Sequence, residues 1–309
     1  MNLVLAAEES AGLQILRALS RTRHRLVAVL ASRPKPDGSG GAVWNAANSL
    51  GLEVRPAHLV RDPAFAGRLR AEHVDLLLNV HSLYVINAEV LAAPRFGAFN
   101  LHPGPLPRYA GLNAVSWAIY RGETQHGVTV HKMEPEIDTG PIAYQSFFSI
   151  DESDTALSVS LKCVKQGVPL MLWLLEVAAS NPRAIPLRPQ DASQREYFGA
   201  EIPRGGRVSW SSPASKVLNF IRACDYLPFR SPWGHPWTRL GEQEVAIIKA
   251  HRTNFLCDAP PGTVGGSTGE GILVASQDQW ILVTKLKALG RHIRAAEILK
   301  EGDQLENES

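Results

Sequence analysis

The sequence predicts an α/β protein with a mostly parallel sheet covered by helices on both faces, followed by a smaller β-rich, barrel-like domain. Apolar strand-like runs alternate with helix-like segments over the first half of the chain, as in repeated βαβ units. These runs are continuously apolar, which is typical of strands buried on both faces. Towards the C-terminus, short β-like segments are separated by Gly and Pro turns, which favours a small β domain.

Each predicted element of the first half follows from its residue pattern. The runs Asn2–Ala6, Leu26–Leu30 and Asp75–Val80 are mostly apolar and predict buried strands. Segment Gly12–Leu19 has leucines at helical spacing, and the pair Asp62–Pro63 fits the start of a helix. The remaining predictions are helices around 44–50 and at 87–91, and strands at 52–55, 97–101, 127–133 and 142–150.

The second half begins with a long helix predicted over Thr155–Ala179. The composition then becomes rich in proline and polar residues, which is typical of a linker. We therefore predict a first domain over 1–180, a linker over 181–205, a β-rich domain over 206–300 and a polar tail over 301–309. In the β-rich domain we predict a helix at 213–223 and strands at 244–250, 271–275 and 280–286.

Composition excludes several classes of protein. The 309 residues are 45% hydrophobic and 20% charged, which excludes a disordered chain. The net charge of +2 comes from 32 basic and 30 acidic residues and indicates no nucleic-acid-binding surface. The three cysteines, Cys163, Cys224 and Cys257, form no CxxC pair, so we expect neither a disulfide scaffold nor a metal site. No apolar run reaches membrane-spanning length, and we expect a cytoplasmic protein without membrane association.

One stretch carries residues suited to catalysis. Asn100 and His102 lie two positions apart at the end of a predicted strand, so both side chains leave the same face. Three prolines and a glycine in residues 103–107 predict a stiff loop. Asp138 follows a later strand and approaches from a neighbouring loop. Because ligands of open α/β sheets bind at the carboxyl ends of strands, we expect these side chains to meet in one cleft.

An amide, an imidazole and a carboxylate in one cleft suit acyl transfer to an amine. Asn100 would donate to the developing oxyanion, a contribution of roughly 10²–10³ in rate. His102 would take a proton or assist the oxyanion, and Asp138 would orient the ring and raise its pKa. The absence of serine and cysteine favours direct attack without a covalent enzyme intermediate. The pattern alone equally allows a capped strand end, a satisfied core histidine and a simple turn at 138–140.

The wider motif resembles the folate-dependent formyltransferase family. The resemblance lies in Phe99–Gly111 (FNLHPGPLPRYAG) and Gly127–Gly140 (GVTVHKMEPEIDTG). The family signature is Asn-x-His at a strand end, a proline-bearing loop and a downstream Asp-Thr-Gly or Asp-Ala-Gly, which Asn100, His102 and Asp138 match. Weaker similarity to the C-terminal domain of methionyl-tRNA and aminoarabinose formyltransferases continues through Arg207–Trp210, Pro232–Gly234, Pro261–Val264 and Gly271–Ala275.

The resemblance implies a Rossmann-like catalytic domain, 10-formyltetrahydrofolate as the formyl donor and no metal. It also implies that Asn100, His102 and Asp138 are catalytic. In this family the pterin ring is held largely by backbone groups of the loop after the strand that aligns with Asp75–Val80. That carries folate binding over to His81, Ser82, Leu83 and Tyr84 of this loop. Ile137, directly before Asp138, is also predicted to bind folate.

Departures from the tRNA-using members of the family bear on the acceptor. Their Gly-Thr-Pro-Glu-Phe after the first strand is replaced here by Ala7–Gly12 (AEESAG). The loop at 33–41, which is often lysine-rich in tRNA users, has only Arg33 and Lys35 as cations. We therefore favour a small amine over tRNA as the acceptor. The predicted acceptor contacts are Glu8, Ser10, Tyr109 and Asn113.

The expected function is transfer of a formyl group to a primary amine or hydroxylamine of a small molecule. An aminosugar nucleotide or an amino-acid derivative such as hydroxyornithine would fit. Three alternatives stay open, namely a methionyl-tRNA formyltransferase, a 10-formyltetrahydrofolate hydrolase and a catalytically inactive folate-binding protein. The sequence indicates no oligomeric state.

Overall fold

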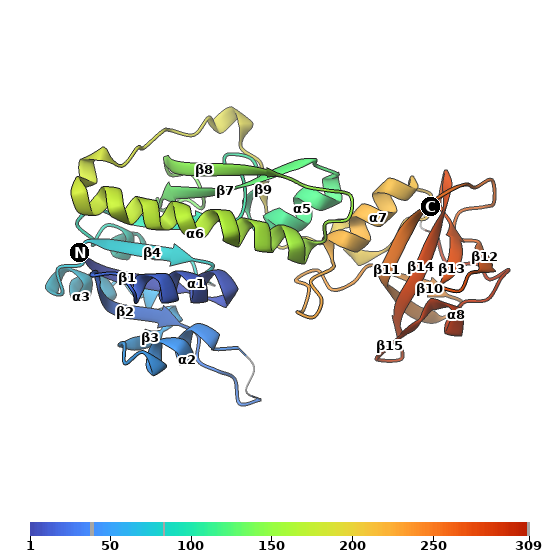
Figure 1. Cartoon of the computed structure of the whole chain (residues 1–309), viewed down its shortest axis with the longest axis horizontal. Helices are drawn as coiled ribbons and strands as arrows, with labels where there is room; N and C mark the ends of the chain where they lie inside the picture. The colour runs from blue at the N-terminus through green and yellow to red at the C-terminus, as the bar shows by residue number, and fades with distance from the viewer. Residues whose placement is uncertain (38–39, 83, 308–309) are drawn as a thin grey trace. The chain divides into compact units, whose positions relative to one another are not determined.

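Seven strands form one sheet from the apolar runs of the first half of the chain (Figure 1). The computed structural model describes residues 1–37, 40–82 and 84–307. The strands are β1 (Asn2–Ala7), β2 (Arg25–Ala31), β3 (Val54–Pro56), β4 (Leu76–Val80), β5 (Ala98–His102), β7 (Gln125–Lys132) and β8 (Ile142–Ser149). Their order is β3-β2-β1-β4-β5-β7-β8. The pairs among β1 to β5 are parallel, whereas β7 is antiparallel to β5, so the sheet is mostly parallel as predicted.

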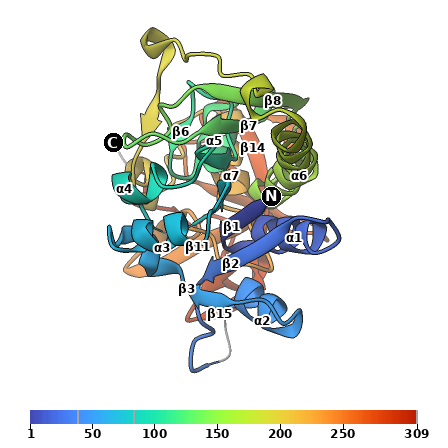
Figure 2. The ribbon, with the colours of Figure 1, turned by 90° about the vertical axis from the view of Figure 1, so that its left-hand side faces the viewer.

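Helices cover both faces of this sheet because successive residues of a strand point to opposite sides. The helices are α1 (Glu9–Leu19), α2 (Ala42–Ser49), α3 (Phe65–Ala71), α4 (Ala88–Leu91) and α6 (Ala156–Ser180). In β1, Leu3 and Leu5 pack in one core with α1, α2 and α6, while Val4 and Ala6 pack in another with α3 and α4. Figure 2 shows these two helical layers on either side of the strands. The predicted α/β class is confirmed.

The strand order brings three carboxyl ends to one edge of the sheet. The chain runs from β1 outwards to β2 and β3, then returns to place β4 and β5 on the other side of β1. Such a switch in direction opens a crevice at the carboxyl ends, where ligands bind in open α/β sheets. The Glu8 N–H donates to the carbonyl of Val80 at 3.1 Å, which ties the ends of β1 and β4 together. His102 ends β5 at the same edge.

The chain divides into two compact units. The first comprises 1–111, 126–148 and 161–197, and the second comprises 112–125, 149–160 and the part after Tyr197. Short 3-10 helices lie at Ala57–Arg61, Pro182–Ala184, Ala192–Gln194 and Pro203–Gly206. Within the described ranges, none of the helices combines the length and apolar character needed to cross a membrane.

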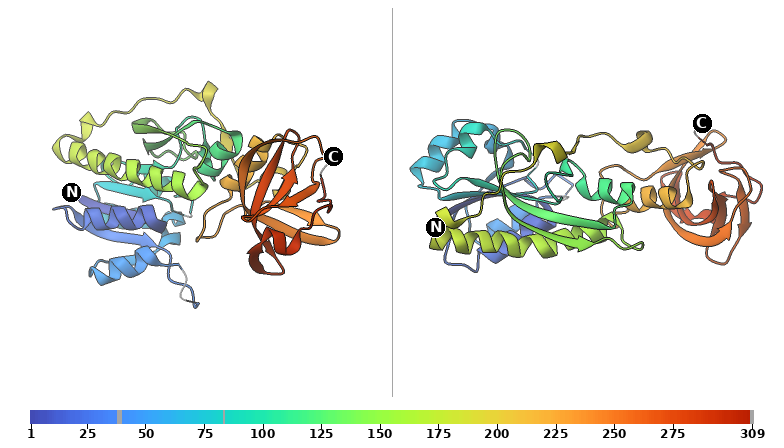
Figure 3. Two further views of the ribbon diagram at one scale, coloured as in Figure 1. Left: turned by 45° about the vertical axis from the view of Figure 1, so that its right-hand side comes forward. Right: turned by 90° about the horizontal axis from the view of Figure 1, so that it is seen from above.

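The second unit has its own antiparallel sheet and core. Its strands are β10 (Trp237–Leu240), β11 (Gln243–Leu256), β12 (Val264–Ser267), β13 (Ile272–Ala275), β14 (Gln279–Ala288) and β15 (Arg291–Arg294). The order is β10-β11-β14-β13-β12, with β15 paired to β14, and Figure 3 shows the sheet strongly curved. The core joins these strands to α7 (Ala214–Ala223) and to the fully buried Trp210. Helix α5 (Ala114–Arg121) packs on α7 in this unit. The predicted β-rich C-terminal domain is confirmed.

The sequence prediction misses several short elements. β6 (Ala110–Gly111) and β9 (Tyr197–Phe198) form a two-stranded sheet, and two residues per strand carry no readable periodicity. Strands β10, β12 and β15 and helix α8 (Ala295–Ile298), each four residues long, are also absent from the prediction. Helix α3 begins at Phe65 and not at the predicted Asp62–Pro63 pair. The Asp62 carboxylate accepts the Ala64 N–H at 2.9 Å, which forms a turn before the helix starts.

Candidate active site

Two side chains of the candidate site leave the carboxyl end of β5. All five residues of β5 are buried, since the strand lies between β4 and β7 and is covered on both faces. Asn100 and His102 are two apart and share a face of the sheet. Only 8% of Asn100 and 3% of His102 is exposed. The strand therefore presents both polar groups from a rigid, apolar support.

The proline loop after β5 is fixed by buried hydrogen bonds. Thr129 Oγ1 donates to the carbonyl of Gly104 at 2.7 Å and accepts the Leu106 N–H at 3.2 Å. Gln145 Nε2 donates to the carbonyl of Leu106 at 2.7 Å. These bonds turn the chain back, so that the carbonyl of Tyr109 faces His102. The loop is held by β7 and β8 as well as by its prolines.

His102 lies between a backbone carbonyl and a carboxylate. Its Nε2 is 2.7 Å from the carbonyl oxygen of Tyr109, and its Nδ1 is 3.4 Å from Asp138 Oδ2. A carbonyl oxygen only accepts hydrogen bonds, so we assign the proton of the neutral ring to Nε2. Burial lowers the pKa of His102, although Asp138 and the Tyr109 carbonyl act in the opposite direction. Asp138 has the raising effect expected from the sequence, but desolvation of the ring outweighs it.

Asp138 reaches the same place from the turn after β7. Its φ of +56° is in the left-handed region, which residues with a Cβ seldom adopt. Its Oδ2 accepts the Gly111 N–H at 2.8 Å, and its Oδ1 lies 3.3 Å from His131 Nε2. Burial alone would raise the pKa of Asp138, but the His102 and His131 rings and the Gly111 N–H hold it well below its usual range. The carboxylate is therefore ionised at neutral pH.

Asn100 joins this pair through His131, which the sequence analysis does not assign to the site. Asn100 lies opposite His131 in the antiparallel pairing of β5 and β7, and its Nδ2 is 3.1 Å from His131 Nε2. Its Oδ1 accepts from Asn79 Nδ2 at 2.9 Å, while the buried Asn79 Oδ1 has no partner among the described residues. Strand register is not visible in a sequence; the only available signal is that His131 lies on the strand preceding Asp138.

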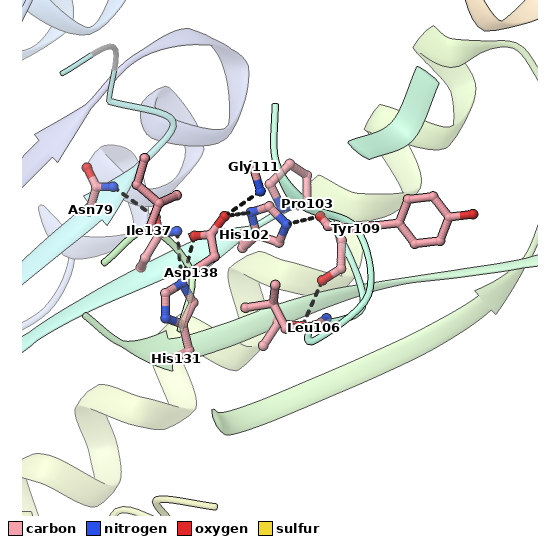
Figure 4. A network of polar contacts seen from close by, with 12 residues as sticks. Asn79, His102, Pro103, Leu106, Tyr109, Gly111, His131, Ile137 and Asp138 are labelled. Carbon is pink, nitrogen blue, oxygen red and sulfur yellow. Dashed lines mark hydrogen bonds and ion pairs between the residues drawn. The ribbon is translucent and has the colours of Figure 1, made fainter. Parts of the chain in front are cut away.

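The predicted trio thus belongs to one polar network, in which His131 connects Asn100 to Asp138. Figure 4 shows His102, His131 and Asp138 pointing toward one another, with the Gly111 backbone beside the carboxylate. The network offers amide N–H donors, an imidazole nitrogen without a proton and an ionised carboxylate. Chemically, such a set can stabilise a developing negative charge and accept a proton in one place.

The predicted folate-binding residues lie in two loops. His81 directly follows β4, with a left-handed φ of +58°, and its Nδ1 lies 3.2 Å from Glu9 Oε2. Ser82 and Tyr84 are half-buried in the same loop, and Leu83 lies outside the described residues. Ile137 is 40% exposed beside Asp138, and its carbonyl accepts from Arg195 at 2.8 Å.

The predicted acceptor contacts occupy different environments. Glu8 is buried and its carboxylate accepts the Ser32 N–H at 2.6 Å, whereas Ser10 is exposed on α1. Tyr109 is buried, with only 1% of its surface exposed, and its backbone carbonyl contacts His102. Asn113 is half-buried and precedes α5 with a left-handed φ of +56°. Across the described residues, no cluster of three or more His, Cys, Asp or Glu side chains is arranged to hold a metal ion.

The known proteins that this chain resembles in sequence and in fold include several formyltransferases. The methionyl-tRNA formyltransferase of Legionella pneumophila is 29% identical over 300 residues, covering 95% of this chain and 92% of the relative. The N-formyltransferase from Helicobacter canadensis, solved in complex with folinic acid and dTDP-3-aminofucose, has a TM-score of 0.69 at 18% identity, covering 91% of this chain and 98% of that one. WlaRD, a sugar 3N-formyl transferase solved in the presence of dTDP and 5-N-formyl-THF, has a TM-score of 0.70 at 17% identity, covering 94% and 98%. At these identities the solved structures establish a shared fold.

Two family models also match the chain. Residues 203–303 match the model of the formyl transferase C-terminal domain, which corresponds to most of the second unit. Residues 1–174, more than half of the chain, match the formyl transferase model itself. The protein is therefore a member of the formyl transferase family.

Proposed function

We propose that this enzyme transfers a formyl group from 10-formyltetrahydrofolate to a primary amine or hydroxylamine of a small molecule. An aminosugar nucleotide or an amino-acid derivative such as hydroxyornithine is the acceptor class that we favour. The observation that carries the proposal is the buried contact of His102 with Asp138, joined to Asn100 through His131. The folate and aminosugar ligands of the structural neighbours support it, since those proteins share this fold.

The proposed chemistry places charge where this network can accept it. Attack of a neutral amine on a formyl carbon puts negative charge on the formyl oxygen and positive charge on the nitrogen. The Asn100 amide has two N–H donors, of which one faces His131, so the other is available for the oxyanion. The donors are fixed beforehand by β5 and by Asn79, so little reorganisation accompanies the reaction.

The same network accepts the proton that the amine loses and returns it to the folate nitrogen, which leaves as the bond between that nitrogen and the formyl carbon breaks. Because Nε2 of His102 donates to Tyr109, Nδ1 is the nitrogen that can take up a proton. The ionised Asp138 lies 3.4 Å from that nitrogen and stabilises the imidazolium that forms. The lowered pKa of His102 keeps the ring neutral before the reaction, which is the state that a proton acceptor requires.

The residues present fit a formyl folate as donor. The loop from His81 to Tyr84 follows β4 at the edge where ligands of this fold class bind. Asn79, which precedes this loop at the end of β4, carries a buried carbonyl oxygen without a partner among the described residues. Such an orphaned acceptor suits an N–H group of a bound ring. The donor supplies the formyl group, and the chain binds and orients it.

Methionyl-tRNA formylation is the second candidate. It is favoured by the 29% identity to the Legionella enzyme over nearly the full length of both chains. The altered sequence Ala7–Gly12 and the scarcity of cations at 33–41 favour a small acceptor instead. The two candidates share the donor and the network around Asp138, so they differ only in what the acceptor side recognises.

The test is an assay of 10-formyltetrahydrofolate with aminosugar nucleotides, hydroxylated amino acids and charged initiator tRNA. We expect tetrahydrofolate release together with a formylated small amine, identified by its mass. His102→Ala is expected to reduce turnover by roughly 10²–10⁴. Formate release without any amine would instead indicate a hydrolase. Near-normal turnover of His102→Ala, or no product from any acceptor, would overturn the proposal.

A further inference from the structure

The segment Arg188–Glu196, which we call the linker strap, lies against both loops that form the candidate site. The backbones of Arg188 and Ile142 exchange two hydrogen bonds of 2.8 and 3.0 Å at the start of β8. At the other end of the strap, the Glu196 N–H donates to the carbonyl of Pro107 at 3.3 Å, and its carbonyl accepts the Ala110 N–H at 2.9 Å. The strap therefore connects the proline loop to the chain that leaves the Asp138 turn.

Between these two ends, side chains of the strap hold the Asp138 turn itself. Gln190 Nε2 donates to the carbonyl of Asp138 at 2.9 Å and to the carbonyl of Gly140 at 2.7 Å. An amide nitrogen has two N–H groups, so both are used on this one turn. Arg195 donates to the carbonyl of Ile137 at 2.8 Å. Three of the four carbonyls at 137–140 thus accept hydrogen bonds from the strap.

The turn needs such support because its backbone is not in a relaxed conformation. Asp138 has a φ of +56°, and a residue with a Cβ persists there only when the surrounding structure holds it. The backbone at Gly140 packs closely against β7, since a Cβ at that position would lie 1.9 Å from the carbonyl oxygen of Lys132. The carboxylate of Asp138 contacts His102 and Gly111 only while this conformation is kept.

We propose that Gln190 of the linker strap is the positioning residue that holds Asp138 against His102, with Arg195 of the same strap supporting Ile137 beside it. This inference rests on the proposed function, because it assigns Gln190 to the support of a catalytic carboxylate. The composition of this segment is typical of a flexible linker, yet its side chains fix the conformation of the Asp138 turn. Gln190 acts through Asp138 and does not touch the reacting atoms.

The test replaces Gln190 by methionine, which has a similar length but no N–H donor. We expect kcat to fall roughly 10- to 100-fold, because a small displacement of a catalytic group has an effect of this order. The KM values for the folate donor and the amine should change less than kcat, because the loop from His81 to Tyr84 is not altered and Ile137 keeps its hydrogen bond from Arg195 in this variant. The matched control is Gln194→Met on the same strap, because the Gln194 side chain donates to Asp191 at 2.9 Å and, within the described residues, has no hydrogen bond to the Asp138 turn.

Three comparisons decide the outcome. Unchanged kcat in Gln190→Met, or an equal loss in Gln194→Met, would overturn the role of Gln190. Should thermal unfolding show that Gln190→Met does not fold, Arg195→Met serves as the second variant. It removes the bond to Ile137, so we expect kcat to fall and the KM for the folate donor to rise; unchanged kcat in that variant would overturn the role of the strap. Asp138→Asn is measured alongside. If Asp138→Asn keeps near-normal turnover, the proposed function fails, whereas an inactive Asp138→Asn with a normal Gln190→Met rejects only the strap.

Discussion

At the scale of single residues, each polar group of the site has its state set by burial and by one or two neighbours. The Asn100 amide is oriented by Asn79 and faces His131. We expect Asn100→Ala to lower kcat by roughly 10²–10³, the usual effect of losing one oxyanion donor, with little change in KM. Steady-state kinetics with the formyl folate donor measures this. A loss confined to KM would contradict a role in stabilising the transition state.

The lowered pKa of His102 predicts a contribution to stability that depends on pH. The unfolded chain titrates this ring near its ordinary value of 6.5, whereas the folded chain resists protonation because the ring is buried. Between the two values the unfolded state binds more protons, so this contribution is complete above about pH 6.5 and is lost as the pH falls. Asp138 adds a similar loss only at more acidic pH, below its unfolded value of 3.8.

His102→Gln should therefore reduce the acid sensitivity of unfolding. We expect its free energy of unfolding to fall less steeply than that of the wild type below about pH 6.5, by up to about 1.4 kcal/mol per pH unit. Chemical denaturation at several pH values between about 5 and 8 measures the two slopes. His24 and His235, whose pKa values burial also lowers, are present in both proteins and cancel in the comparison. Parallel slopes would show that His102 is not buried in its neutral form.

The sequence predicts which residues form the site better than it predicts the contacts that hold them in place. Asn100, His102 and Asp138 stand out because their motif is local in the chain. His131 enters through antiparallel register, and Asn79 enters through parallel register with Asn100. Gln190 contacts Asp138 across 52 positions of the chain. Such contacts depend on tertiary packing, which no local pattern encodes.

At the scale of elements, the turn after β7 illustrates how one glycine fixes a functional loop. A Cβ on Gly140 would lie 1.9 Å from a backbone oxygen, so the chain cannot keep its path with alanine there. We expect Gly140→Ala to lower the melting temperature and to abolish turnover, because the Cβ would push the turn away from the Lys132 carbonyl and the Asp138 conformation would shift. Thermal unfolding and the transfer assay measure the two effects.

The matched control for that prediction is Gly67→Ala. Gly67 is exposed in the middle of α3, and a Cβ there meets nothing within 4 Å. Alanine is the better helix former by roughly 0.8–1.0 kcal/mol, so this variant should be more stable and equally active. Equal destabilisation by the two substitutions would contradict the close approach at Gly140.

Elements with a clear pattern of hydrophobic residues are predicted well. Elements that depend on hydrogen bonds to distant parts of the chain are not. Strands β1 and β4 are apolar except for Asn2 and Asn79, and they are found within a residue or two of the prediction. β6 and β9 exist only because Ala110 and Leu112 bond to the chain around Phe198. The linker strap has the composition of a flexible connection, yet its backbone and side chains bond to both loops of the site.

At the scale of the whole molecule, the balanced charge bears on the acceptor. A net charge of +2 over 309 residues gives little sequence-independent attraction for a polyanion. A protein that recognises tRNA through many phosphate contacts loses binding steeply as salt rises, whereas a small amine held by short-range contacts is affected much less. Salt dependence therefore separates the two candidate acceptors.

We expect turnover of the small amine acceptor to change less than about threefold between 50 and 200 mM salt, because few phosphate contacts are involved. Over the same range, bulk tRNA should give no complex by gel shift, and inorganic polyphosphate, a polyanion without an acceptor amine, serves as the control. A complex with charged initiator tRNA that survives about 200 mM salt and is formylated faster than any small amine would assign the enzyme to tRNA instead. In that case the recognition surface would have to come from the distribution of the arginines and lysines, since the net charge of +2 supplies too little attraction.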